Sequence, residues 1–288
     1  PYLDAIEVKI IPDDTVKATS LQSGDIQLTD YLTTTSIQML KAVPNKTVEM
    51  LPSGDIYILF PNVKTDVLSD IKVRQAINYA LNRQEFVDMV TMGLGDVSNW
   101  AAYKTQWFWT DYDPYSYDPE KAKSLLAQSG WDQSKSIRFC IDSGDSTFVN
   151  AASVIAAQWA AVGIKADIQT MDINTLMSTA SSGDFDVLSV QYTYPPVDPY
   201  ADVAWLLGGQ GSWTGYTRPE VEEALSNVAL TNDKDKLKEL YGIVDRSVQE
   251  DVPMFSAYII KTMAAANKRL TGVKPSVYGF FNHVEQWD

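Results

Sequence analysis

The sequence predicts an α/β protein, and three observations carry this prediction. Strand-like and helix-like segments alternate along nearly the whole chain, as they do in proteins that cover a sheet with helices. Most helix-like segments carry start or stop signals of their own. The chain has 288 residues, of which 45% are hydrophobic, so it is long enough to bury a sizeable core and to divide into two compact units.

The alternation of strands and helices is already seen in the first 60 residues. Residues 5–11 (AIEVKII) are strand-like, and residues 13–24 are typical of a helix with an aspartate cap and with Gly24 as its stop. The segments that follow are a short strand at 25–30, a helix at 33–43 and strands at 46–51 and 55–60.

The helix signals are strongest in the middle of the chain. Asp70 is a natural cap for a helix whose apolar residues recur at helical spacing, and Asn82 separates it from a second helix. A further helix starts with Asp118 and Pro119 and stops at Gly130. The later segments are a strand at 136–142, a helix at 147–162, a strand at 164–170, a helix at 172–183, a strand at 185–191, a largely helical region at 219–250 and a strand at 253–267.

Composition narrows the classes of function. Lys and Arg number 23 against 37 Asp and Glu, and the net charge of −14 disfavours nucleic acids and anionic membrane surfaces as partners. The single cysteine, Cys140, excludes an internal disulfide, and its alternating strand predicts a buried, inert thiol. The single histidine, His283, leaves little scope for an imidazole metal site or a Ser-His-Asp triad. We expect no cofactor and no bound metal.

The alternative that the protein is an enzyme depends on two aspartates. Asp184 and Asp186 stand two apart on a predicted strand, share a face and could suggest acid/base catalysis by a hydrolase. The alternative, which we favour, is that one caps the turn after the preceding helix and the other begins the strand. The sequence has no G-x-S-x-G elbow, no phosphate-binding glycine loop and no H-E-x-x-H motif. We therefore expect no catalytic residues.

Residues 190–205 (VQYTYPPVDPYADVAW) form an unusual corner. They hold too many prolines for a regular helix or an inner strand. The corner is a structural turn, a wall of a ligand pocket or part of a catalytic site. We interpret Asp198 as a cap for the helix that follows rather than as a ligand contact.

Several segments together resemble one known family. In order and spacing they are similar to landmarks of the peptide- and nickel-binding family of extracellular solute-binding proteins, which serve ABC importers. The segments are LSDIKVRQAINYALNRQEFVDMVTMGLG (68–95), YDPEKAKSLLAQSGW (117–131), QWAAVGIKADIQTMD (158–172), SSGDFDVLSVQYTY (181–194) and TRPEVEEALSNV (217–228). The resemblance covers essentially the whole chain.

The resemblance implies a two-lobed periplasmic-binding-protein-like α/β fold. Because family members have a long part ahead of the segment at residues 3–13, we expect a fragment that holds one complete lobe and part of the other. The hinge should lie near Pro61 and Pro253, in strand-like runs that would otherwise be ordinary edge strands. The expected division is 1–56 as the end segment of lobe I, 57–253 as lobe II and 254–288 as the return to lobe I.

The resemblance also places ligand contacts directly after the strand at 185–191. Dipeptide and oligopeptide binders of the family carry an aspartate just after the aromatic residue that ends this strand, and it pairs with the ligand's amino group. Here the aromatic residue is Tyr192, and the position of the aspartate falls on Pro195. Dipeptide binders also supply an arginine, yet no Lys or Arg occurs between Arg138 and Lys165. We expect a peptide that is not held by its termini.

Aromatic side chains occur in the regions where the family's charged aspartate and arginine are missing. Aromatic faces with a few hydroxyls suit stacking on sugars, amides or apolar side chains, and we expect binding to vary little with salt. In the loop that holds Trp107, Phe108 and Trp109, the alternative is that these rings seal the lobe's own surface. The predicted ligand-binding residues are Tyr192, Thr193, Tyr194, Trp213, Asn150 and Trp107.

The function that these observations favour is delivery of a peptide-class ligand to an ABC importer by lobe closure. The expected location is the extracellular side of the cytoplasmic membrane, as a periplasmic protein or a cell-surface lipoprotein. The expected partners are the ligand and the membrane permease, with the protein itself a monomer. An oligosaccharide or a nickel chelate is the alternative ligand, although Tyr200 stands where the nickel branch has a histidine. A sensory domain would differ only in its partner.

Overall fold

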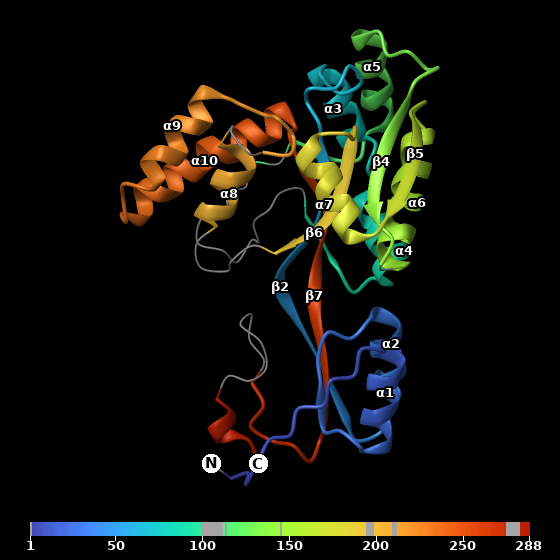
Figure 1. Ribbon diagram of the computed structural model, residues 1–288, viewed down its shortest axis with the longest axis vertical. Coiled ribbons are helices and arrows are strands. Elements are labelled where there is room, and N and C mark those ends of the chain that lie inside the picture. Colours follow the sequence, from blue (N-terminus) through green and yellow to red (C-terminus); the bar gives the residue numbers. More distant parts are fainter. Residues whose placement is uncertain are drawn as a thin grey trace. The chain divides into compact units, whose positions relative to one another are not determined.

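A computed structural model of the chain describes residues 2–98, 112, 114–144, 146–193, 199–208, 212–274 and 283–288. The chain divides into two compact units, of which the smaller comprises Pro1–Gly54 and Ile260–Asp288 and the larger comprises Asp55–Ile259. Two strands, β2 (Lys46–Pro61) and β7 (Phe255–Asn267), each run from one unit into the other (Figure 1).

The division between the units falls inside these two strands. It lies between Gly54 and Asp55 in β2 and between Ile259 and Ile260 in β7. Of the two prolines near the expected hinge, Pro61 is the last residue of β2 and Pro253 precedes β7, and a hinge at either one stays a prediction. The assignment of the two units to lobes of a solute-binding protein stays a prediction.

In the smaller unit, two helices are joined through one carboxylate. Helix α1 (Asp14–Ser23) has the predicted aspartate cap, Asp13, and helix α2 (Thr34–Lys41) has Thr33 as its N-cap. The carboxylate of Asp14 accepts hydrogen bonds from the backbone N–H of Thr33 at 3.1 Å and from the hydroxyl of Ser36 at 2.5 Å. The start of α1 therefore also holds the start of α2. The unit further contains β1 (Leu28–Thr29) and the short 3-10 helix η1 (Val284–Gln286).

Four of the predicted strands need correction. Residues 5–11 form no strand, and Ile6, Val8 and Ile10 are exposed, Ile10 by 92%. An alternating pattern becomes a strand only when another strand supplies hydrogen bonds, and no described strand pairs with this segment. The strand expected at 25–30 shortens to β1, which pairs with β7, and the strands expected at 46–51 and 55–60 are the single strand β2.

The larger unit is built on a mixed sheet. Strand β6 (Val187–Thr193) runs antiparallel to β2 and parallel to β4 (Ser136–Asp142), and β4 runs parallel to β5 (Lys165–Met171). The short strand β3 (Asp96–Val97) pairs antiparallel with β7. In the register between β2 and β6, Ile56 lies opposite Tyr192 and Phe60 lies opposite Leu188. This register positions the candidate site.

Helices cover both faces of this sheet (Figure 1). One face carries Ile56, Phe60 and Leu188 and is covered by α7 (Ile173–Ser182), α8 (Tyr200–Leu207), α9 (Pro219–Val228) and α10 (Lys234–Asp251). On the other face Phe139 contacts Trp159 across a ring separation of 5.4 Å. The helices on that side are α3 (Ile71–Tyr79), α4 (Arg83–Thr91), α5 (Pro119–Ser129) and α6 (Ser146–Ala160). This layered arrangement confirms the predicted α/β class.

The helix boundaries follow the predicted local signals. Asp70, Asn82 and Asp118 are the N-caps of α3, α4 and α5, and each side chain accepts a hydrogen bond from a backbone N–H in the first turn. Gly130 ends α5 and Gly183 ends α7, both in the left-handed conformation that favours glycine. These ends are set by nearby residues, so the sequence predicts them well.

Candidate ligand-binding site

The carboxyl end of β6 carries the first predicted ligand-binding residue. Tyr192 lies half-buried on the same side of β6 as Leu188 and packs against the core, and its hydroxyl donates a hydrogen bond to Oδ1 of Asp202 at 2.7 Å. Burial raises the pKa of the Tyr192 phenol, and the Asp202 carboxylate raises that pKa further. The phenol therefore stays protonated and acts as a donor.

Helix α8 begins after Pro199, which stands at its N-cap position and makes no side-chain cap hydrogen bond. The interpretation of Asp198 as a cap stays a prediction. Asp198 itself lies outside the described residues. The acidic residue in the first turn of α8 is Asp202, and a carboxylate there interacts favourably with the helix dipole.

Trp213 is held between two other rings. Its ring meets Phe60 of β2 edge-on at 5.5 Å and 83°, and meets Trp205 of α8 at 4.8 Å and 87°. Edge-to-face contacts of this kind add about 0.5–1.5 kcal/mol beyond simple burial. Trp205 is 38% exposed, so the cluster reaches the surface of the larger unit.

Helix α8 brings Tyr192 and Trp213 to one place. Asp202 contacts Tyr192 and Trp205 contacts Trp213, and these two residues of α8 are three positions apart, on one face of the helix. We call the four side chains of Tyr192, Asp202, Trp205 and Trp213 the α8 corner. It combines aromatic faces with a carboxylate, a set that suits amide, sugar or ammonium groups.

The other predicted ligand-binding residues are not part of the α8 corner as described. Thr193 is the last residue of β6, while Tyr194 and Trp107 lie outside the described residues, as do Phe108 and Trp109. Asn150 is exposed on α6. Because β4 and β6 are parallel, the start of α6 and the end of β6 lie at the same edge of the sheet, but α6 and α8 cover opposite faces. Ligand contact by all these residues stays a prediction.

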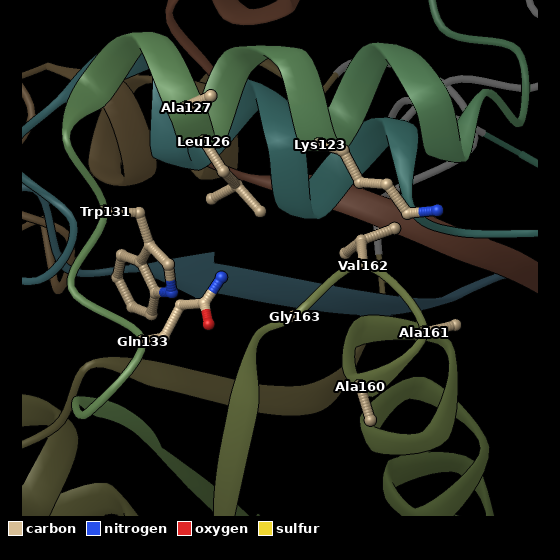
Figure 2. Close-up of a pocket in the computed structure, with 9 residues that line it drawn as sticks. All are labelled: Lys123, Leu126, Ala127, Trp131, Gln133, Ala160, Ala161, Val162 and Gly163. Atoms are coloured by element: carbon tan, nitrogen blue, oxygen red, sulfur yellow. The ribbon is translucent and has the colours of Figure 1, made fainter.

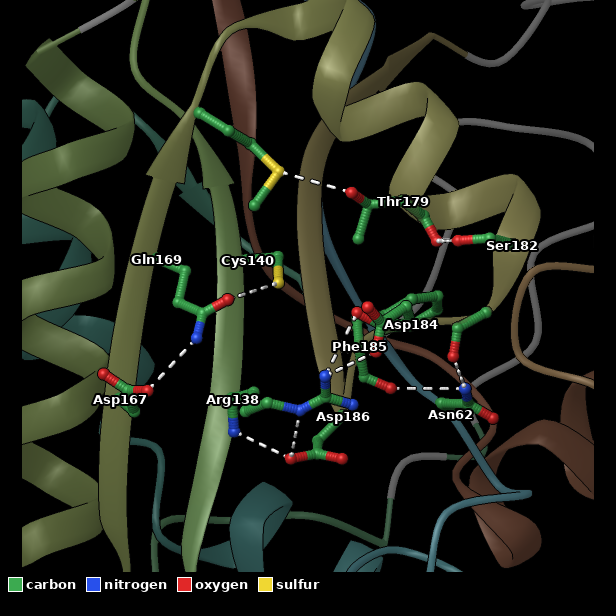
Figure 3. A network of polar contacts seen from close by, with 12 residues as sticks. Asn62, Arg138, Cys140, Asp167, Gln169, Thr179, Ser182, Asp184, Phe185 and Asp186 are labelled. Atoms are coloured by element: carbon green, nitrogen blue, oxygen red, sulfur yellow. Dashed lines mark hydrogen bonds and ion pairs between the residues drawn. The ribbon is translucent and has the colours of Figure 1, made fainter.

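Asp184 and Asp186, the two carboxylates that a hydrolase would use, both contact Arg138 (Figure 3). Nη1 of Arg138 lies 2.6 Å from Oδ1 of Asp184, and the backbone N–H of Arg138 donates to Oδ2 of Asp186 at 2.8 Å. The amide of Asn62 donates to the carbonyls of Gly183 and Phe185 on the same segment.

Both carboxylates therefore have a structural partner across the sheet. Asp184 does not cap the helix end with its side chain, which corrects that part of the sequence interpretation, since its carboxylate pairs with Arg138 instead. Asp186 is only 5% exposed and precedes β6, where it fixes β4 beside β6. An acid/base pair would need both carboxylates open to a substrate, and that of Asp186 is buried, whereas the Asp184 side chain is exposed.

The lone cysteine and the lone histidine add no reactive site. Cys140 is buried, as predicted, and burial raises the pKa of its thiol to about 11. His283 lies exposed in the smaller unit, with Nδ1 at 3.3 Å from Oε1 of Glu285. Within the part of the chain that the structure describes, no three His, Cys, Asp or Glu residues are placed to hold a metal ion.

A cavity of about 550 Å³ lies elsewhere in the larger unit (Figure 2). It opens between the carboxyl ends of α5 and α6, before the start of β4 and β5, and thus at the sheet edge opposite to Tyr192. None of the residues that line the cavity is among the predicted ligand contacts. They are Lys123, Leu126, Ala127, Trp131, Gln133, Ala160, Ala161, Val162 and Gly163.

Asp202 is not among the residues predicted from the sequence. The family resemblance places a carboxylate at Pro195, three residues after Tyr192, whereas the carboxylate that contacts Tyr192 is ten residues along the chain and on a helix. The sequence does hold one indication that Asp202 is unusual. No Lys or Arg occurs from Val187 to Thr217, so Asp202 has no cationic residue near it in sequence.

Comparison with known proteins gives consistent matches. A family model described as bacterial extracellular solute-binding proteins, family 5 Middle, matches residues 1–214. A dipeptide-binding protein of Escherichia coli K12 is 30% identical over 263 residues, which cover 88% of this chain and 49% of that protein. Heme-binding protein A of Haemophilus influenzae is 26% identical over 291 residues, which cover 96% of this chain and 52% of that protein.

A solved structure shows the same fold. The ABC transporter substrate-binding protein CtaP of Listeria monocytogenes matches with a TM-score of 0.88 at 20% identity, over 94% of this chain and 58% of that one. The chain spans about half the length of the curated relatives it matches. Among the described residues, every helix is too short or too polar to cross a lipid bilayer.

Proposed function

Because this chain belongs to the bacterial extracellular solute-binding proteins of family 5, we propose that it captures a peptide-class ligand and delivers it to an ABC importer. The observation that carries the proposal is the family match over residues 1–214, which includes both Tyr192 and Trp213. The dipeptide-binding relative, at 30% identity, supports a peptide-class ligand.

The proposed mechanism is capture by closure. A ligand that contacts two lobes stabilises the closed form over the open form by the difference in its affinity for the two. The α8 corner would supply one wall of the binding site in the larger unit. We propose that the closed form then docks on the permease, on the extracellular side of the cytoplasmic membrane, with the protein as a periplasmic or lipid-anchored monomer.

Other ligand classes have weaker support. The heme-binding relative shows that proteins at this level of identity are named for unlike ligands. A nickel chelate would call for an imidazole, and Tyr200 at the start of α8 supplies a phenol, which is a poor nickel ligand at neutral pH. An oligosaccharide would suit the rings of the α8 corner, but no relative named above points to one.

Ligand identification tests the proposal. Mass spectrometry of small molecules that co-purify with the whole protein should find peptides, and calorimetry should show binding of a tetrapeptide pool. Maltotetraose and nickel–histidine serve as the competing ligands. Binding of either competitor without binding of any peptide would overturn the peptide assignment while leaving the transport role intact.

A transport role predicts that the protein does not hydrolyse its peptide ligand. Peptides incubated with the protein should stay chemically intact, because Arg138 binds both carboxylates of the weighed acid/base pair. Hydrolysis that disappears in the variants Asp184→Asn or Asp186→Asn would contradict the transport role.

A further inference from the structure

The cavity between α5 and α6 is framed by two helix ends of the same kind (Figure 2). Gly130 after α5 and Gly163 after α6 both have the left-handed conformation in which glycine commonly ends a helix. Directly after Gly130, the backbone N–H of Trp131 donates a hydrogen bond to the carbonyl of Leu126 at 3.1 Å. This bond turns the chain back along α5, so Trp131 and Leu126 lie together in the cavity wall.

Trp131 carries a buried donor without an acceptor. Its indole Nε1 is shut off from solvent and has no hydrogen-bond partner among the described residues. The side chain of Gln133, which is exposed, lies next to this nitrogen (Figure 2). A buried N–H group that lacks an acceptor is costly, so its presence in a cavity wall calls for an explanation.

The wall around this donor is mostly apolar. Leu126 and Val162 are buried in it, and the ends of the two helices add three alanines to the lining. A water molecule at Nε1 would have few further polar partners in such surroundings. A ligand with an apolar body and one acceptor would satisfy the N–H and also remove the wall from water. The volume of about 550 Å³ falls in the range of small-ligand sites.

The charges around the cavity favour an uncharged ligand group. The carboxyl ends of α5 and α6 carry negative partial charge, and Asp132 adds a carboxylate whose pKa is lowered by hydrogen bonds from Ser134. Both features disfavour an anion, and Lys123 offers it no free charge because its ammonium pairs with Glu120 at 2.8 Å. A cationic ammonium group has no acceptor for the indole N–H. An amide is neutral and both accepts and donates hydrogen bonds.

We propose that this cavity is a second ligand site, which binds a small apolar molecule through an uncharged amide group. The exposed side chain of Gln133 rotates away from the indole, the ligand carbonyl accepts a hydrogen bond from Nε1 of Trp131, and the Gln133 amide pairs with the ligand N–H. The apolar body lies on Leu126 and Val162. The cavity is at the sheet edge opposite to Tyr192, so the inference does not rest on the proposed function.

The test uses one leucine skeleton in three charge states. N-acetyl-leucinamide is neutral, N-acetyl-leucine carries a carboxylate, and leucinamide carries an ammonium group at slightly acidic pH. Each probe is titrated into the whole protein labelled with nitrogen-15 in its tryptophans, and the indole N–H resonances are followed by NMR. The Trp131 resonance is the one that the variant Trp131→Phe lacks.

The expected result is binding of the neutral probe at Trp131. N-acetyl-leucinamide should shift the Trp131 resonance along a saturable curve, with a Kd on the order of millimolar for a ligand of this size. The two charged probes should bind about fivefold or more weakly. Gln133→Leu should weaken binding of the neutral probe about fivefold. Gln128→Leu is the matched control, because Gln128 is exposed on α5 outside the cavity lining, and its effect should stay within about twofold.

The other outcomes would overturn the proposal. A Trp131 resonance that stays in place throughout the titration would refute the site. Equal affinities for the three probes, or for the two glutamine variants, would refute recognition of an amide. Shifts of the Trp205 and Trp213 resonances without a shift of Trp131 would place the probe at the α8 corner instead, which leaves the proposed function intact. If Trp131→Phe does not fold, the indole resonance that Gln133→Leu displaces and Gln128→Leu does not is that of Trp131.

Discussion

At the scale of single residues, Tyr192 and Trp213 are held by contacts within the larger unit. Tyr192 is fixed by its strand register and by Asp202, and Trp213 is fixed between Phe60 and Trp205. Rings that are pre-positioned in this way lose little further freedom when they contact a ligand. This rigidity favours their use as a binding wall.

Replacing either ring by alanine should weaken ligand binding. We expect Tyr192→Ala and Trp213→Ala each to cost about 1–3 kcal/mol of binding free energy, since each removes a buried aromatic contact. Calorimetry with the tetrapeptide pool measures this, and Tyr117→Ala, at a tyrosine that is 47% exposed, is the control. Pro195→Asp should not restore the lost affinity. Unchanged binding in both alanine variants would show that the corner is only a structural turn.

The two carboxylates bound by Arg138 should differ in their contribution to stability. Asp186→Ala removes a buried carboxylate and leaves the partly buried backbone N–H of Arg138 without its acceptor, and it should lower the free energy of unfolding by about 1–3 kcal/mol. Asp184→Ala removes an exposed ion pair, which contributes about 0–1 kcal/mol. Urea unfolding of both variants measures the difference. Equal losses would contradict the structural role assigned to Asp186.

At the scale of elements, two buried arginines join the pair α3–α4 to the end of α10 and the start of β7. Arg74 of α3 donates to the carbonyls of Asp251 and Leu68, at 2.9 and 2.8 Å. Arg83 of α4 donates to the carbonyl of Ser256 at 2.9 Å. The segment that leads back toward the smaller unit is thus held by long, planar donors rather than by apolar packing alone.

Replacing Arg74 by methionine should destabilise the larger unit strongly. Arg74→Met keeps much of the apolar stem but removes the donors to backbone carbonyls, and we expect a loss of about 3 kcal/mol in the free energy of unfolding. Lys238→Met, at an exposed lysine of α10, should change it by less than about 0.5 kcal/mol. Urea midpoints that agree between the two variants would refute the anchoring role of Arg74.

At the scale of the whole molecule, the two units should differ in protection from hydrogen exchange. The larger unit holds a continuous buried cluster between β2, β6 and helices α7 to α10, whereas residues 5–11 of the smaller unit pair with no described strand. We expect slow exchange in β4 and β6 and fast exchange at Val8 and Ile10. Exchange measured by mass spectrometry that is uniform across both units would contradict this.

The sequence by itself determined the features that depend on near neighbours. Helix starts at Asp70 and Asn82 follow from side chains that accept hydrogen bonds two or three residues ahead. The order of helices and strands in the larger unit follows from periodicity, and the family follows from ordered motifs along the chain. Neither kind of signal needs knowledge of what lies far away in the sequence.

Only the tertiary structure decided which distant groups meet. Residues 5–11 have the pattern of a strand and form none, because pairing requires a partner that local sequence does not specify. The contact between Tyr192 and Asp202 depends on how α8 lies against the end of β6, and the binding of Asp186 depends on the pairing of β4 with β6. A side chain acquires its charge partner through packing, so the α8 corner could be identified only after the fold was known.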